Sequence, residues 1–269
     1  MNIIIANQKG GVGKTTLSIL LANYLTIVKN EEALVIDMDD QRSFYGKWVK
    51  EGKEHDEGVY NEILNLLSDF PQIVKENTLP IDAENKLNTL IENLTEQVKN
   101  TPELRVFLDN AIAYTWENKQ YYEVLSKDLS EYGSIRKTLK AAKDAFVIMD
   151  LPGKMDDDHL IPIYEDADLV ICPTRYDELT ITSTFHFVQT LRMINADVPI
   201  IFIPNMVKST VKYELKSQIK EKLSLFGKVE ADLPDRAMLQ RLTSFDIPND
   251  LKDLLSSLCD NMYNDFLRK

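Results

Sequence analysis

A glycine-rich segment close to the start of the chain combines residue types that bind phosphate. It reads KGGVGKTT from Lys9 to Thr16, after a short apolar run and before a helical pattern. Glycines permit backbone conformations that turn successive N–H groups inward, and a helix N-terminus adds donors for an anion. In such loops the final lysine contacts the β- and γ-phosphates, and the next hydroxyl coordinates Mg²⁺. The predicted nucleotide-binding residues are Gly10, Gly11, Val12, Gly13, Lys14, Thr15 and Thr16, with Thr15 also a metal ligand.

The segment departs from the strict P-loop pattern at one position. That pattern has a glycine six residues before its final lysine, and this chain has Gln8 there. A second lysine, Lys9, lies inside the loop instead. Because a strand pattern, the loop, GKTT and a helical pattern follow one another in order, we interpret the segment as a phosphate loop and not as an ordinary glycine-rich turn.

Two aspartates lie at the ends of later apolar runs. Asp37 ends the run in VIDMDDQRS, and Asp150 ends the run in FVIMDLPG. An acid at the end of a buried strand is what a Mg²⁺–nucleotide site requires opposite its phosphate loop. A single such aspartate could equally cap a helix, but two of them together with a phosphate loop favour a metal-binding role.

The elements that position these residues alternate between strand and helix. Short apolar runs are typical of buried parallel strands, and helical patterns separate most of them. This alternation predicts an α/β fold with a doubly wound, mostly parallel sheet, in which ligands bind at the carboxyl ends of the strands. We expect one domain over residues 1–269. The expected strands are 2–6, 33–37, 145–150, 168–172 and 198–203, and the expected helices are 14–28, 180–194, 211–225 and 251–269.

The region from about residue 48 to 142 interrupts this alternation. No strand is expected there, and helical patterns at 58–68, 81–99, 102–125 and 129–142 predict a helical insertion. Aromatic residues gather in it, which favours a packed helical lobe and leaves a partner-docking surface as the alternative. They are Phe107, Tyr114, Trp116, Tyr121 and Tyr122.

The motifs NQKGGVGKTT, VIDMDDQ and VIMDLPG, in this order and spacing, resemble the ParA/MinD superfamily of deviant Walker ATPases, and NQKGG resembles its ParA branch. The resemblance implies an ATP-bound homodimer in which Lys9 reaches the nucleotide of the partner subunit. It implies that Asp39 positions the attacking water, that Asp37 supports the Mg²⁺ shell and that Asp150 is the Walker B acid. It also implies that Asn205, at the end of IIFIPN, reads the adenine base.

The resemblance further implies slow, Mg²⁺-dependent ATP hydrolysis stimulated by a partner protein, with Lys9, Lys14 and Asp39 as the catalytic residues. The expected function is an ATP-dependent dimerising switch in the partitioning of DNA of a plasmid, a chromosome or a mobile element. The alternative is a nucleotide-switched adaptor that regulates conjugative transfer or protein positioning without binding DNA.

The charge of the chain bears on these alternatives. The net charge is −12, so nucleic acid and anionic lipid repel the protein at long range. Weak, nonspecific DNA binding would therefore need a local basic patch. Lys212, Lys216 and Lys220 recur every four residues, which predicts one helix face, although Glu214 and Glu221 favour an ordinary solvated face. The full candidate patch is Lys208, Lys212, Lys216, Lys220, Lys222, Arg236 and Arg241.

The last helical pattern is strongly amphipathic, as are membrane-targeting helices in the MinD branch. Its basic residues are balanced by acidic ones, whereas membrane-surface helices carry a basic polar face. We therefore expect it to pack on the domain and expect no membrane binding. The first residues lack the composition of a secretory signal, so we expect a cytoplasmic protein.

Overall fold

The computed structural model describes residues 1–67, 86–99, 104–109, 112, 121–141, 145–235, 239 and 242–268. The chain forms two compact units. The first, here named the sheet unit, comprises Met1–Gly46 and Tyr121–Lys269, and the second, the helical unit, comprises Lys47–Gln120.

The described strands of the sheet unit form one parallel sheet, as the sequence predicts. The seven strands lie in the order β3-β2-β4-β1-β5-β6-β7. The central strands are buried along their whole length, which is why they consist almost entirely of apolar residues. The strands are β1 Asn2–Ile5, β2 Ala33–Asp37, β3 Glu123–Ser126, β4 Phe146–Asp150, β5 Leu169–Thr174, β6 Ile200–Pro204 and β7 Lys228–Val229.

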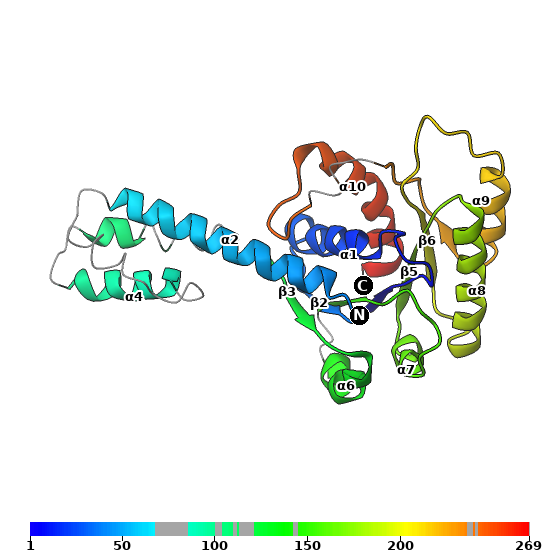
Figure 1. Ribbon diagram of the computed structural model, residues 1–269, viewed down its shortest axis with the longest axis horizontal. Helices are drawn as coiled ribbons and strands as arrows, with labels where there is room; N and C mark the ends of the chain where they lie inside the picture. Colours follow the sequence, from blue (N-terminus) through cyan, green and yellow to red (C-terminus); the bar gives the residue numbers. More distant parts are fainter. Residues whose placement is uncertain are drawn as a thin grey trace. The chain divides into compact units, whose positions relative to one another are not determined.

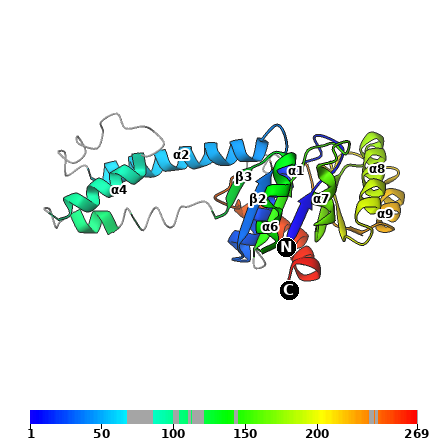
Figure 2. The same cartoon turned by 90° about the horizontal axis from the view of Figure 1, so that it is seen from below.

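Helices cover both faces of this sheet, which confirms the doubly wound arrangement. Side chains of α6, α7, α8 and α9 share one core with alternate strand residues, among them Ile4 and Val147. Figure 2 shows α6 and α7 on the same side of the sheet. Helix α1 packs on the other face, with α10 beside it (Figure 1). These helices are α1 Lys14–Asn23, α6 Tyr132–Ala141, α7 Leu160–Glu165, α8 Glu178–Ile194, α9 Lys216–Ser224 and α10 Asn249–Met262.

Strand β3 corrects the prediction that residues 48–142 contain no strand. It pairs in parallel with β2, with Asp37 opposite Ser126. Residues 123–126 therefore do not continue the helix that we expected over 102–125. A short 3₁₀ turn, Leu129–Glu131, leads from β3 into α6, and both belong to the sheet unit.

The helical unit has a small core of its own. Helix α2, Ser43–Leu66, begins in the sheet unit and continues into the helical unit, where α4, Lys86–Gln97, follows it. Tyr114 and Trp116 lie outside the described residues, and the interpretation of residues 48–142 as an insertion in a single domain stays a prediction. The buried core residues are Val59, Tyr60, Ile63, Leu67, Leu90, Leu94, Leu104 and Leu108.

The amphipathic C-terminal helix packs on the sheet unit. Leu255, Leu258 and Met262 of α10 are at most 2% exposed. Beyond α10 the chain continues as a π-helical turn, Tyr263–Leu267. Helix α1 continues as a π-helical turn, Tyr24–Val28, and Lys29 follows it. The Lys29 ammonium lies 2.7 Å from Asp260 of α10 and 4.9 Å from the Tyr263 ring centre, so it joins the end of this turn to the C-terminal helix. Among the described residues, no helix is long and apolar enough to cross a membrane.

Candidate nucleotide site

The phosphate loop joins the end of β1 to the start of α1. Gly11 and Gly13 have φ values of 70° and 95°, in the left-handed region that favours glycine. Gly13 directly precedes α1, which begins at Lys14. Lys14 is 8% exposed, and burial lowers the pKa of its ammonium, although Asp150 and Asp39 act in the opposite direction. Lys9, by contrast, is exposed on the surface of the loop.

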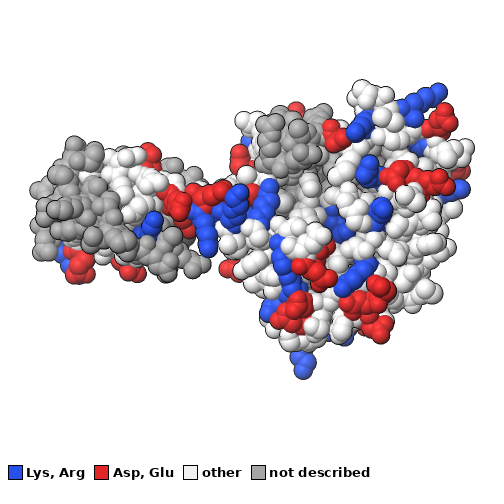
Figure 3. Space-filling model, viewed as in Figure 1, with Lys and Arg blue, Asp and Glu red and all other residues white. Residues whose placement is uncertain are grey.

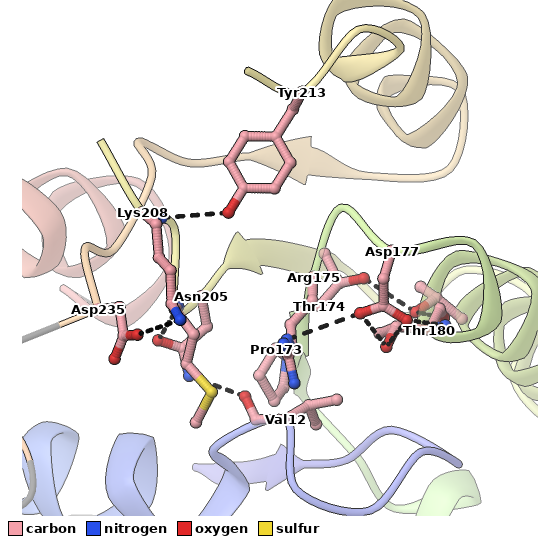
Figure 4. A network of polar contacts seen from close by, with 12 residues as sticks. Val12, Pro173, Thr174, Arg175, Asp177, Thr180, Asn205, Lys208, Tyr213 and Asp235 are labelled. Atoms are coloured by element: carbon pink, nitrogen blue, oxygen red, sulfur yellow. Dashed lines mark hydrogen bonds and ion pairs between the residues drawn. The ribbon is translucent and has the colours of Figure 1, made fainter. Parts of the chain in front are cut away.

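Two buried asparagines hold this loop in place. The Asn7 side chain accepts a hydrogen bond from the Lys9 N–H at 2.9 Å. The Asn205 amide donates to the Val12 carbonyl oxygen at 2.7 Å, as Figure 4 shows. A Cβ atom at Gly13 would lie 2.1 Å from the Asn205 amide nitrogen, so this close approach also requires glycine. Asn205 therefore lies against the phosphate loop, and its expected role in reading adenine stays a prediction.

Asp150 lies beside this loop at the carboxyl end of β4. In the register of the sheet it is opposite both Ile5 of β1 and Asp37 of β2. Both carboxylate oxygens are buried and have no hydrogen bond of regular geometry among the described residues, although the Thr15 hydroxyl lies near enough to stabilise the ionised carboxylate. Burial raises the pKa of Asp150 to about 7, against the opposing effects of Thr15 and Lys14. Because unpartnered buried carboxylate oxygens are costly, and because Mg²⁺ prefers oxygen ligands, the residues present fit a bound Mg²⁺–nucleotide.

Asp37 has a second task beside the one predicted for it. Its carboxylate accepts hydrogen bonds from Phe44 N at 3.0 Å and Tyr45 N at 2.9 Å, which satisfies free N–H groups in the first turn of α2. A third bond comes from Asp39 N at 3.2 Å. Burial raises the pKa of Asp37, while these backbone bonds lower it. Asp37 thus acts as a helix cap in this structure, and metal support remains a prediction.

Asp39 follows on the same loop. It is half-buried, and its carboxylate accepts a hydrogen bond from Gln41 N at 3.0 Å. The bond from Asp39 N to Asp37 joins the two acids, so the residue predicted to position water is held next to the residue predicted to support the metal.

Gly153 is part of the site although sequence reasoning gave it no role. A Cβ atom there would lie 3.2 Å from the Gln8 carbonyl oxygen and 3.3 Å from the Lys14 ammonium nitrogen. The loop after β4 therefore closes tightly against the phosphate loop, and a larger residue would press on it. The available signal was the glycine in FVIMDLPG, three residues after Asp150.

The structure differs from the prediction of a basic helix face. Helix α9 begins at Lys216 and not near residue 211, so Lys208 and Lys212 precede the helix. Lys216 and Lys220 both form ion pairs with Asp232, the latter at 2.8 Å. Figure 3 shows lysine and arginine interspersed with acidic residues on the face viewed. Arg236 and Arg241 lie outside the described residues.

The fold and the loop together define a nucleotide-binding protein with a phosphate loop after the first strand of a doubly wound parallel sheet. Comparison with known families agrees with this class. The family model for the CobQ/CobB/MinD/ParA nucleotide binding domain matches residues 3–243, and the chain belongs to this family. The resemblance to ParA and MinD seen in the motifs is thereby confirmed.

Solved structures share the fold over almost the whole chain. A candidate plasmid partition protein from Borrelia burgdorferi, bound to AMPPNP, has a TM-score of 0.56 at 20% identity and covers 98% of both chains. MinD from Aquifex aeolicus has a TM-score of 0.55 at 15% identity, covering 98% of this chain and 97% of that one. An ATP complex of McdA from Cyanothece also has a TM-score of 0.55 at 15% identity, covering 98% of this chain and 95% of that one.

A curated relative matches a shorter stretch. An uncharacterised protein of Methanocaldococcus jannaschii is 29% identical over an alignment of 140 residues, and the match covers 41% of this chain and 54% of that protein. The match thus spans about half of that relative's length.

Proposed function

We propose that the protein is a slow ATPase that dimerises when it binds ATP and acts as a switch in DNA partitioning. The observation that carries the proposal is the contrast between two lysines of one loop. Lys14 is buried beneath the loop beside Asp150, whereas Lys9 is exposed. An exposed lysine in a phosphate loop is available to the phosphates of a second subunit, as the resemblance to deviant Walker ATPases implies.

The residues of the site have separate tasks in this proposal. The N–H groups from Gly10 to Thr16 and the Lys14 ammonium would hold the phosphates. Thr15 and Asp150 would hold Mg²⁺, which supplies positive charge against the phosphate oxygens. Asp39 orients a water molecule, and Lys9 of the second subunit adds charge that the first subunit does not supply. Hydrolysis by an isolated subunit is therefore slow, and a partner protein that completes the site would accelerate it.

The proposal is tested by trapping the ATP-bound state. Asp39→Ala should bind ATP without turning it over, so light scattering should give a mass near twice 30.9 kDa when Mg²⁺ and ATP are present. Adding Lys9→Ala should restore the single mass, whereas adding Lys252→Ala, which removes an exposed lysine of α10, should not. A single mass for Asp39→Ala at high protein concentration, with ATP bound, would rule out the dimerising switch.

One observation favours the adaptor that does not bind DNA. Asp232 pairs with both Lys216 and Lys220, so its single negative charge offsets about half of the positive charge of these two lysines of the predicted DNA-binding face. Co-sedimentation with DNA at low salt, with and without ATP, separates the two functions. The partition switch predicts ATP-dependent binding that falls steeply with salt and is lost when Lys212, Lys216 and Lys220 become Glu, with hydrolysis unchanged. No ATP-dependent binding at any salt concentration would favour the adaptor.

A further inference from the structure

A series of hydrogen bonds, all buried except the first, connects the backbone of Lys9 to helix α8. It starts with the bond from Lys9 N to the Asn7 side-chain oxygen. The Asn7 amide nitrogen donates to the Pro173 carbonyl oxygen at 2.8 Å and to the Thr184 hydroxyl at 2.9 Å. The Thr184 hydroxyl in turn donates to the Thr180 carbonyl oxygen at 2.8 Å. Asn7, Thr180 and Thr184 are at most 2% exposed, so water does not compete for these bonds.

The donors and acceptors in this series of hydrogen bonds allow only one orientation of the Asn7 amide and one direction for each hydroxyl hydrogen. The Pro173 carbonyl can only accept, so the Asn7 amide must turn its nitrogen toward Pro173 and its oxygen toward the Lys9 N–H. Because the hydroxyl hydrogen of Thr184 goes to Thr180, the Thr184 oxygen is left to accept from Asn7. Thr174, whose hydroxyl lies 3.0 Å from that oxygen, is then the donor of the pair.

The hydrogen-bond series ends at the first turn of α8, which is itself held in place. The Asp177 carboxylate caps this helix by accepting from Thr180 N at 3.0 Å, a contact drawn in Figure 4. Asp177 also lies 3.6 Å from the Arg175 guanidinium. The orientation of the Asn7 amide, and with it the Lys9 backbone, is therefore set by residues of β5 and α8 that lie outside the phosphate loop.

We propose that Asn7 is a positioning residue for Lys9 and that Thr184 fixes Asn7 for this task. The inference rests on the proposed function, because Lys9 acts across the dimer. Lys14 begins α1 and does not bond to Asn7, and its ammonium meets the Lys9 carbonyl oxygen only at 3.5 Å. Loss of the Thr184 hydroxyl should therefore weaken ATP-dependent dimerisation while the affinity of the subunit for Mg²⁺–ATP changes little.

The test compares matched variants in the Asp39→Ala background. Thr184→Val keeps the shape of the side chain but removes the hydroxyl, and Thr184→Ser restores the hydroxyl. Thr26→Val is the control, because Thr26 is a buried threonine of the π-helical turn after α1, at the far end of that helix from the loop. Its hydroxyl also bonds back to a carbonyl oxygen, that of Ala22 at 2.8 Å. Three quantities are measured: dimerisation with ATP, ATP affinity, and amide hydrogen exchange of the loop without nucleotide.

We expect Thr184→Val to weaken dimerisation about tenfold and to speed exchange of the loop, since it leaves one buried Asn7 amide hydrogen with only the weakly accepting Cys172 sulfur at 3.5 Å. ATP affinity should stay within about threefold, and Thr184→Ser and Thr26→Val should match the parent in all three measurements. Equal dimerisation and equal exchange in Thr184→Val and Thr26→Val would overturn the inference and leave the proposed function standing.

Two further results are informative. If the Asp39→Ala parent does not dimerise, the proposed function fails, and unchanged loop exchange in Thr184→Val would then overturn the positioning role as well. If Thr184→Val does not fold, Asn7→Ser takes its place, because it shortens the side chain that carries both bonds. Unchanged exchange and dimerisation in Asn7→Ser would contradict the positioning role.

Discussion

Replacing Gly13 by alanine should destabilise the protein through two separable effects. The first is backbone strain, because φ is 95° at this position, and a left-handed conformation costs a residue with a Cβ about 1–2 kcal/mol. The second is a collision, because the new Cβ would lie 2.1 Å from the Asn205 amide nitrogen. The amide must then leave the Val12 carbonyl oxygen, which costs about 1–3 kcal/mol for a buried acceptor. The sum is about 2–5 kcal/mol.

A double-mutant cycle with Asn205→Ala separates these effects. The truncated residue has no amide to collide with, so Gly13→Ala should then cost only the backbone term of about 1–2 kcal/mol. Urea unfolding without nucleotide, followed by circular dichroism, measures all four proteins. If Gly13→Ala costs the same in both backgrounds, the close contact between Gly13 and Asn205 is not what requires glycine, and the reasoning is wrong.

Three further predictions concern the site, acid stability and the C-terminal helix. Lys14→Ala should lose saturable, Mg²⁺-dependent ATP binding, measured by calorimetry; binding as tight as that of the natural chain would contradict the site assignment. Although burial alone would raise it, hydrogen bonds from Arg136, Lys140 and Tyr132 lower the pKa of Asp166 to about 2. A lowered folded-state pKa contributes stability that is complete above about pH 4 and is lost as the pH falls toward 2, here about 2 kcal/mol. The difference in urea midpoint between the natural chain and Asp166→Asn should therefore shrink across this range, and a constant difference would refute the assignment. Because the apolar face of α10 is buried, the full chain should not float with anionic vesicles, with or without ATP; flotation would mean that α10 leaves the sheet unit.

The buried centre of the sheet could be predicted from the sequence, and its edges could not. Strand β2 occupies the predicted residues, and β4 differs by one, because both lie between two other strands and are apolar up to their final aspartate. Strand β3 lies at an edge, and only Val124 in it is buried. Its short alternating pattern carried too little signal to separate it from the helical patterns before it. Strand β7, two residues at the other edge, carried even less.

In the site, the features set by neighbouring residues could be predicted from the sequence, and those set by distant residues could not. The glycines and Lys14 could be assigned from spacing, since one loop contains them all. The late start of α9 could not be predicted, because Tyr213 just before it packs on a distant residue: its ring centre lies 5.2 Å from that of Tyr176. Its hydroxyl also accepts from Lys208 N at 3.1 Å. The pairing of Lys216 and Lys220 with Asp232 likewise depends on how α9 folds back toward the chain after β7.

The anchoring of the phosphate loop has a consequence for the order of synthesis on the ribosome. The loop is among the first segments to be made, but its supports come from far along the chain, at Pro173, Thr184 and Asn205. At about 5–20 residues per second, Asn205 is made roughly 10 to 40 s after Gly13. A nascent chain, or one truncated before β6, therefore lacks Asn205 and its hydrogen bond to the loop. In the proposed dimerising switch, only chains whose translation has passed this point would therefore form the ATP-bound dimer.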